Sequence, residues 1–231
     1  MRGGGARAGE MAVPADLITG VAAQADAAIV TIGRNAGEGR DRSAGMGDFQ
    51  LTVAEQDLIK AVSEAFKAQK KKTVVVLNIG GVIEVASWRD RPDAILLAWQ
   101  GGQESGHSIA DILSGKVNPS GKLASTFPVR YEDVPSAPTF PGREIAPATP
   151  PPAQALAQAE GRRGGGREAE VTYEDGVYVG YRYYESFNVR PAYEFGYGLS
   201  YTTFEYSNLK LSAADFKGAI KATVDIKNSG A

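Results

Sequence analysis

The sequence predicts an α/β fold, an open and mostly parallel sheet with flanking helices, followed by a truncated β-sandwich-like segment. Between residues 12 and 128, short apolar runs rich in β-branched residues alternate with segments of helical periodicity. Strands joined by helices in this way form right-handed crossovers in a parallel sheet. Beyond residue 203 the pattern changes, because residues 204–211 and 219–226 alternate as antiparallel strands do.

The elements of the first part can be placed in order. Strands are expected over residues 27–32, 73–79, 94–100 and 120–127. The first three run into glycines, which let the backbone approach a ligand at the carboxyl end of a parallel strand. The clearest helix spans residues 52–69, where Thr52 is a candidate N-cap and Glu55 completes a capping box. A further helix is expected over residues 105–114, with Gly115 ending it.

Composition divides the chain into five segments. The glycine-rich start is interpreted as a leader or tag, and tyrosine is concentrated between residues 173 and 206, where packing at a domain junction is the expected role. The predicted segments are a leader at 1–11, the α/β domain at 12–142, a Pro/Gly-rich linker at 143–170, an aromatic junction segment at 171–203 and the start of a further β domain at 204–231.

The ionisable residues exclude several classes of function. Lys and Arg number 25 and Asp and Glu number 27, so the net charge of −2 lacks the basic excess typical of nucleic-acid binders. The absence of cysteine excludes disulfides, Cys-ligated zinc and thiol catalysis, and a single histidine, His107, argues against a His-rich metal site. No apolar run is long enough to span a membrane and no signal peptide is recognisable, so no membrane partner is expected and a cytoplasmic location is favoured.

One acidic residue stands out in the loop after the first expected strand. Residues 33–42 read GRNAGEGRDR, so Glu38 lies between two glycines and is surrounded by arginines. The glycines leave its carboxylate open to a ligand. The spacing matches neither the dinucleotide-binding nor the P-loop motif, and a phosphate loop would avoid an acid at its centre. From these residues alone, Glu38 is a candidate either for catalysis or for a structural role.

Three stretches resemble family 3 glycoside hydrolases, most closely their bacterial β-glucosidases: IGRNAGEGRDR, WQGGQESGHSIADILSGKVNPSGKLASTFP and YVGYRYYESFNVRPAYEFGYGLSYT. The resemblance implies an incomplete family 3 sandwich domain followed by the start of a fibronectin-III-like domain. It implies a retaining hydrolase of terminal β-linked glucose, with Glu38 as general acid/base and no cofactor or metal. It also implies that Arg40, Asp41 and Arg42 brace the loop by ion pairing.

The family's nucleophile lies on a barrel that this sequence does not contain, so a barrel supplied in trans, or self-association, is an expected partnership beside the β-glucoside substrate. Asp41, Asp48 and Glu104 are the carboxylates to test for a replacement nucleophile, and His107 is expected on a helix, as a surface or packing residue. Two alternatives remain. One is a non-catalytic carbohydrate-binding or barrel-docking fragment. The other is a flavodoxin-like signalling or nucleotide-binding domain, which the absence of an acidic metal cluster and of a phosphate motif disfavours.

Overall fold

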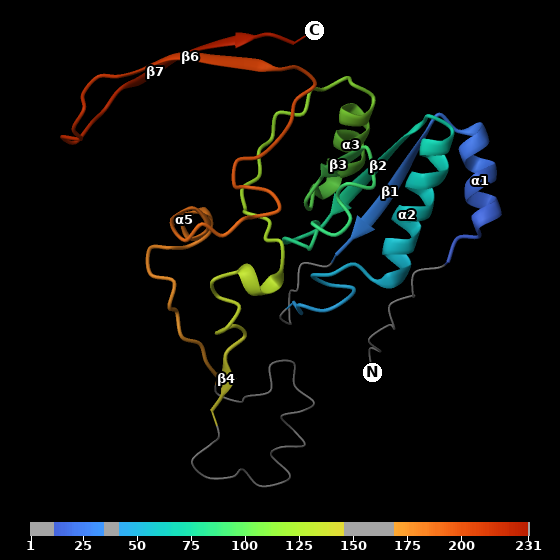
Figure 1. The fold of residues 1–231 in the computed structure, drawn as a ribbon, viewed down its shortest axis with the longest axis horizontal. Coiled ribbons are helices and arrows are strands. Elements are labelled where there is room, and N and C mark those ends of the chain that lie inside the picture. The colour runs from blue at the N-terminus through green and yellow to red at the C-terminus, as the bar shows by residue number, and fades with distance from the viewer. Residues whose placement is uncertain (1–11, 35–41, 146–168, 231) are drawn as a thin grey trace.

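The computed structural model describes residues 12–34, 42–145 and 169–230 (Figure 1). Its sheet consists of β1 (Ala27–Gly33), β2 (Lys72–Asn78) and β3 (Ala94–Leu97), all parallel and in the order β1-β2-β3. The parallel sheet predicted from the sequence is therefore confirmed. The third strand ends earlier than expected, and Trp99 then takes a positive φ of 49°, which is incompatible with an extended strand.

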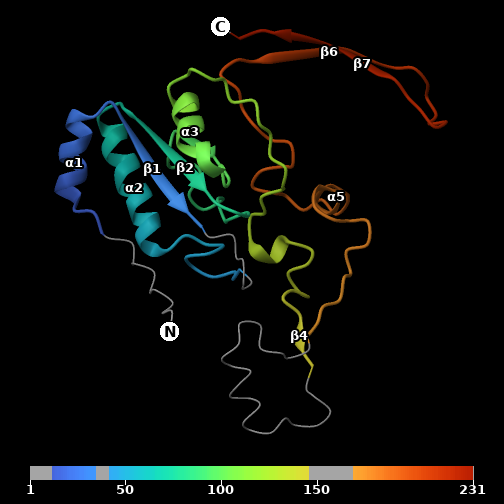
Figure 2. The same cartoon turned by 180° about the vertical axis from the view of Figure 1, so that it is seen from behind.

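Two helices lie side by side, as both views show (Figures 1 and 2), and the second of them packs against β1 and β2. They are α1 (Ala15–Gln24), which sequence analysis did not name, and α2 (Val53–Ala68). The predicted capping box is present, because Thr52 Oγ1 accepts from the Glu55 N–H and the Glu55 carboxylate accepts from the Thr52 N–H. At the far end of α2, Lys71 Nζ donates to the Ala22 carbonyl at 2.8 Å, which satisfies a carbonyl in the last turn of α1.

The main core lies between this helical layer and the sheet and continues into the loop after β2. Alternate side chains of β1 are buried, whereas Ile29 on the other face remains 59% exposed. Apolar burial of this kind supplies most of the free energy that holds the elements together. The largest fully buried apolar side chains are those of Leu51, Ile59, Val75, Val76, Leu77, Ile79, Ile83, Val85, Trp88 and Pro128.

The remaining helices are short. After β3 the chain forms a 3-10 turn, η1 (Gly102–Glu104), and α3 (Ser105–Leu113), which lies at the β3 end of the sheet. A second 3-10 turn, η2 (Tyr131–Asp133), and α5 (Tyr181–Ser186) follow later in the chain.

The prediction of a strand over residues 120–127 is wrong. This segment does not join the parallel sheet. It runs as extended chain beside residues 192–197, and it is linked to them by the Leu123 N–H to Tyr197 carbonyl bond of 2.8 Å and by an isolated antiparallel bridge from Phe127 to Tyr193. Proline has no N–H to donate to a ladder, and Pro128 and Pro191 stand at the ends of the two segments, so the pairing stops at isolated bonds.

Two antiparallel hairpin-like pairs complete the described structure. β4 (Arg143–Glu144) pairs with β5 (Ala169–Glu170), so the two ends of the predicted linker lie together. β6 (Phe204–Leu211) pairs with β7 (Ala222–Asn228), close to the predicted strands, and this hairpin extends away from the sheet (Figure 1). No helix among the described residues is long and apolar enough to cross a membrane.

Candidate functional site at the carboxyl edge of the sheet

The carboxyl ends of β1 and β2 bring together the two segments on which the site is built. β1 continues into Arg34, and β2 continues into Gly81 and Val82. Ligand sites of open α/β sheets lie at this edge. Glu38, the predicted acid/base, lies outside the described residues together with Arg40 and Asp41, whereas the arginines on either side of that segment, Arg34 and Arg42, are described.

Arg34 is buried and all its nitrogens are engaged. Nη1 and Nη2 donate to the two carboxylate oxygens of Glu55 at 2.6 and 2.7 Å, and Nε donates to the Asp48 carbonyl at 2.9 Å. Burial alone would raise the pKa of Glu55, but the hydrogen bonds from Arg34 and from the Thr52 N–H, with the charge of Arg34, outweigh it and hold that pKa below its ordinary value. The Glu55 carboxylate of the capping box predicted at Thr52 thus also fixes Arg34, the residue that follows β1.

Arg42 is held from two sides. Its Nε lies 2.6 Å from Asp48 Oδ1, and its Nη1 donates to the Val82 carbonyl at 3.0 Å. A methyl group on Gly81 would lie 2.5 Å from Nη1, so only glycine leaves room for the guanidinium in this position. The predicted ion pairing of Arg42 is therefore present, with Asp48 as its partner.

A cavity of about 510 Å³ opens beside Arg42, between the edge of the sheet and the aromatic segment. Two polar atoms, Arg42 Nη2 and Thr126 Oγ1, are buried there and have no hydrogen-bond partner in the described part of the chain. The stacked rings of Tyr181 and Phe195, with centroids 5.0 Å apart, form part of the wall. Ring faces with a few polar groups are the usual lining of a small-molecule site. Further lining side chains are Ser43, Phe49, Tyr131, Ser136, Asp175 and Tyr184.

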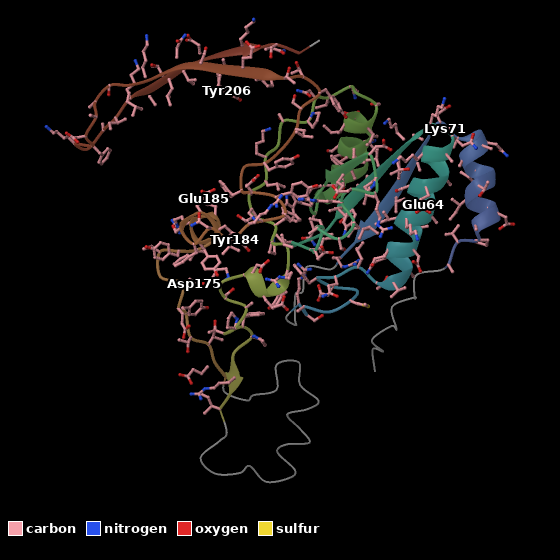
Figure 3. All side chains as sticks on the ribbon, viewed as in Figure 1. Glu64, Lys71, Asp175, Tyr184, Glu185 and Tyr206 are labelled. Atoms are coloured by element: carbon pink, nitrogen blue, oxygen red, sulfur yellow. The ribbon has the colours of Figure 1, made fainter. Side chains whose placement is uncertain are left out.

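Tyr184, on α5, is the buried phenol of this wall (Figure 3). Burial, then the neighbouring charges of Asp133 and Tyr183, raise its pKa to about 12. The phenol is therefore neutral over the whole physiological range, and its ring packs edge to face against Tyr183 with centroids 5.6 Å apart. The tyrosines of this part of the chain were expected to pack at a domain junction, and nothing in the sequence distinguishes Tyr184 as a wall of the cavity.

The structure separates the other candidate residues. Asp48 is ion-paired with Arg42, whereas Glu104 lies in η1, on the loop after β3, with an exposed side chain. His107 lies on α3, the predicted helix, and of the two expected roles it has the surface one, because its side chain is exposed and its Nδ1 lies 2.6 Å from Glu104 Oε2. Among the described residues, no three His, Cys, Asp or Glu side chains gather in a way that could hold a metal ion.

Known proteins resemble this chain in sequence and in fold. Residues 14–201 match the sequence profile of the Glycosyl hydrolase family 3 C-terminal domain. The chain belongs to glycosyl hydrolase family 3. A family 3 relative of known structure, β-glucosidase 3B from Thermotoga neapolitana in complex with glucose, is 48% identical and superposes on 94% of this chain with a TM-score of 0.79. A second, a β-glucosidase from Paenibacillus barengoltzii, is 31% identical over 95% of this chain with a TM-score of 0.75.

A curated relative, β-glucosidase A from Butyrivibrio fibrisolvens, is 37% identical over 96% of this chain. The chain spans 28% of that relative's length, 27% of the Thermotoga enzyme and 22% of the Paenibacillus enzyme. The family is thus established for this chain. The chain corresponds to about a quarter of the length of each of these β-glucosidases.

Proposed function

We propose that this segment forms the acid/base part of the active site of a retaining β-glucosidase, with Glu38 as the acid/base. The observation that carries the proposal is that Arg34 and Arg42, which flank the GEG motif in the sequence, both lie at the carboxyl edge of the sheet in a chain of family 3. The names of the relatives support β-linked glucosides as the substrate class.

The chemistry assigns Glu38 two successive tasks. Its protonated carboxyl first gives a proton to the glycosidic oxygen as the bond to the anomeric carbon breaks and a carboxylate nucleophile bonds to that carbon. The resulting Glu38 carboxylate then takes a proton from water, whose oxygen displaces the nucleophile. The acid therefore matters most for alkoxide leaving groups, which cannot depart without protonation.

The nucleophile of this proposal comes from outside the segment, on the barrel of the family pattern. Retaining hydrolysis needs two carboxyl groups about 5–5.5 Å apart. Of the replacement candidates, Asp48 already accepts hydrogen bonds at both carboxylate oxygens, from Arg42 and from the Ser43 N–H, and Glu104 is paired with His107. The cavity beside Arg42 is the place we propose for part of the substrate.

The test uses a hybrid enzyme in which this segment replaces the matched part of the Thermotoga β-glucosidase. In Glu38→Gln, kcat/KM should fall far more for alkyl glucosides than for activated aryl glucosides, and azide should partly restore deglycosylation of the aryl substrate. The matched control is Glu64→Gln, which removes an exposed carboxylate on α2 (Figure 3) and should leave both rates unchanged. Equal losses for both substrates, without azide rescue, would contradict the assignment.

The segment made alone gives a second test. General acid catalysis contributes on the order of 10²–10⁴-fold, well below the acceleration of a hydrolase. We therefore expect little or no turnover from the 231-residue polypeptide and activity once the missing part of the relative is supplied. Robust turnover by the segment alone, abolished in Glu38→Gln, would require a nucleophile within it. A hybrid that binds glucosides, yet turns over normally in Glu38→Gln, would favour the non-catalytic alternative.

A further inference from the structure

A second cavity, of about 310 Å³, lies on α5 and on the segment that follows it. This volume is at the small end of the range for ligand pockets. The second cavity shares the wall of Tyr181, Tyr184 and Phe195 with the cavity beside Arg42. Four side chains that can hydrogen-bond a ligand line the second cavity and not the first: Glu185, Asn188, Arg190 and Glu194.

Backbone hydrogen bonds fix both sides of this cavity. After α5 the chain turns at Asn188, whose φ of 52° is a conformation that asparagine adopts more readily than most residues. The turn is closed by a bond of 2.9 Å from the Val189 N–H to the Tyr184 carbonyl. The opposite side begins at Ala192, whose N–H donates to the Phe127 carbonyl at 2.8 Å. The polar groups of the cavity therefore stand on backbone that is held in place.

The four polar side chains of the second cavity are exposed, and they make no hydrogen bond or ion pair with any described residue. The carboxylates of Glu185 and Glu194 can only accept hydrogen bonds, the Arg190 guanidinium can only donate them, and the Asn188 amide does both. Two carboxylates and one guanidinium leave a net charge of −1. A matching ligand offers donors and acceptors together and carries no negative charge.

Phe195 adds an apolar surface to this polar set. Its ring stacks on Tyr181 with centroids 5.0 Å apart and an angle of 30° between the planes, and half of the residue remains exposed. The Arg182 guanidinium lies over the Tyr181 ring, 5.9 Å from its centroid, and helps to hold the pair. Sugar rings suit such a surface, because their C–H groups contact an aromatic ring by dispersion while their hydroxyls both donate and accept.

We infer that the second cavity binds a neutral pyranose unit of a glycoside or oligosaccharide, with Phe195 against its C–H groups and Glu185, Asn188 and Glu194 bonded to its hydroxyls. A pyranose satisfies acceptors and donors at once and adds no charge to the carboxylates. Sugars are also the chemistry of the family to which the chain belongs. The inference concerns binding without turnover and does not depend on the assignment of Glu38.

The test is saturation-transfer difference NMR on the 231-residue chain, with methyl β-glucoside and cellobiose as probes. We expect a Kd of about 1 mM, ordinary for ligands of this size. Glu185→Gln removes a charged acceptor from the second cavity alone and should raise the Kd about 10-fold. Methyl β-glucuronide should bind about fivefold more weakly than the glucoside, because its carboxylate meets a cavity of net negative charge.

Asp175→Asn is the matched control for the location. The Asp175 carboxylate lines the cavity beside Arg42 and not the second one, whereas Glu185 lines the second alone (Figure 3). Asp175→Asn should leave the Kd unchanged. If Asp175→Asn weakens binding and Glu185→Gln does not, the sugar occupies the first cavity and the inference is wrong.

A second pair of variants tests the ring. Phe195 and Phe187 are 50% and 56% exposed, but only Phe195 lines the cavity. Phe195→Leu should raise the Kd about fivefold, and Phe187→Leu should leave it unchanged. Equal effects of these two variants, equal binding of glucoside and glucuronide, or no saturable binding by wild type would each overturn the inference. Because the substituted side chains are exposed, all four variants are expected to fold.

Discussion

Arg34 donates two parallel hydrogen bonds, of 2.6 and 2.7 Å, to the carboxylate of Glu55, and both side chains are buried. This pair joins the end of β1 to the first turn of α2. Because the same carboxylate accepts the Thr52 N–H, one acidic group serves the helix cap and the sheet edge together. The edge on which the candidate site is built is therefore fixed by an ion pair in addition to apolar contacts.

The first prediction concerns the stability that this pair provides. Glu55→Gln leaves the guanidinium of Arg34 buried without its countercharge, and removal of one partner of a buried pair costs about 3–5 kcal/mol. Urea denaturation at pH 7 should show a loss of this size. Glu64→Gln, on the exposed side of α2, should change the free energy of unfolding by less than about 0.5 kcal/mol.

The pH dependence of the same pair has a definite sign. The pKa of Glu55 is lowered in the folded protein from its ordinary value of 4.5, so its stabilisation is present above pH 4.5 and is lost as the pH falls through the lowered value. Wild-type protein should lose free energy of unfolding over that range, and Glu55→Gln should lose less. Parallel acid profiles for the two proteins would contradict the assignment.

The second prediction concerns alkaline pH. The pKa of Tyr184 is raised from 10.0 to about 12, so folding favours its neutral form and this contribution is lost as the pH rises from 10 to 12. A pKa shift of two units corresponds to a contribution of at most about 2.7 kcal/mol to the free energy of unfolding. Tyr184→Phe should lose less stability over this range than wild type. Tyr206→Phe, which alters a phenol that is 69% exposed on β6 (Figure 3), should keep the wild-type slope.

The third prediction concerns residues 143–170. The composition of this segment predicts a linker, and its basic residues Arg162, Arg163 and Arg167 are trypsin sites. Brief digestion should cut there first, with the new ends identified by mass spectrometry. Cleavage within α2, for example after Lys60 or Lys67, before any cut in the segment would show that the linker prediction is wrong.

The fourth prediction concerns the hairpin of β6 and β7. Tyr206 and Ile226 lie opposite each other in the register and are 69% and 58% exposed, and Phe204, Leu209, Leu211 and Val224 are also exposed. An exposed apolar face of this kind promotes association. We expect the segment alone to self-associate, and Tyr206→Ser with Ile226→Ser to shift sedimentation velocity profiles toward monomer.

The control for the hairpin replaces a pair of charged residues instead of the apolar pair. Glu205 and Lys227 face each other in the register and lie on the other side of the hairpin. Glu205→Gln with Lys227→Gln should leave the association unchanged. If both double variants behave like wild type, the hairpin does not drive the association.

Local patterns predicted much of this fold. The β-branched runs identified β1 and β2, and Thr52 with Glu55 located the start of α2, because these signals depend on neighbours in the sequence. The segment 120–127 was expected to be a strand of the parallel sheet, but its partner lies at residues 192–197, and no local signal reports so distant a pairing. The helix α1 was missed because its apolar residues are broken by Gly20 and by polar positions.

The candidate site shows the same division. The GEG motif predicts Glu38 as the acid/base, which stays a prediction because Glu38 lies outside the described residues, and the arginines beside it predict ion pairing. Their partners could not be assigned from the sequence, because Arg34 reaches Glu55 across a turn of the fold and Arg42 reaches Val82 on another strand-end loop. The cavity wall formed by α5 likewise depends on chain returning from far along the sequence.

The pairing of β4 with β5 has a consequence for how this protein can change. Arg143 and Glu170 are ion-paired at 2.7 Å across that pair, so the chain between the two strands leaves and re-enters the fold at one point. The entropy of closing such a loop grows only with the logarithm of its length, and a doubling costs about 0.6 kcal/mol. Residues can therefore be gained or lost here in evolution at little thermodynamic cost, and the same point would accept an epitope tag or a reporter without disturbing the sheet edge.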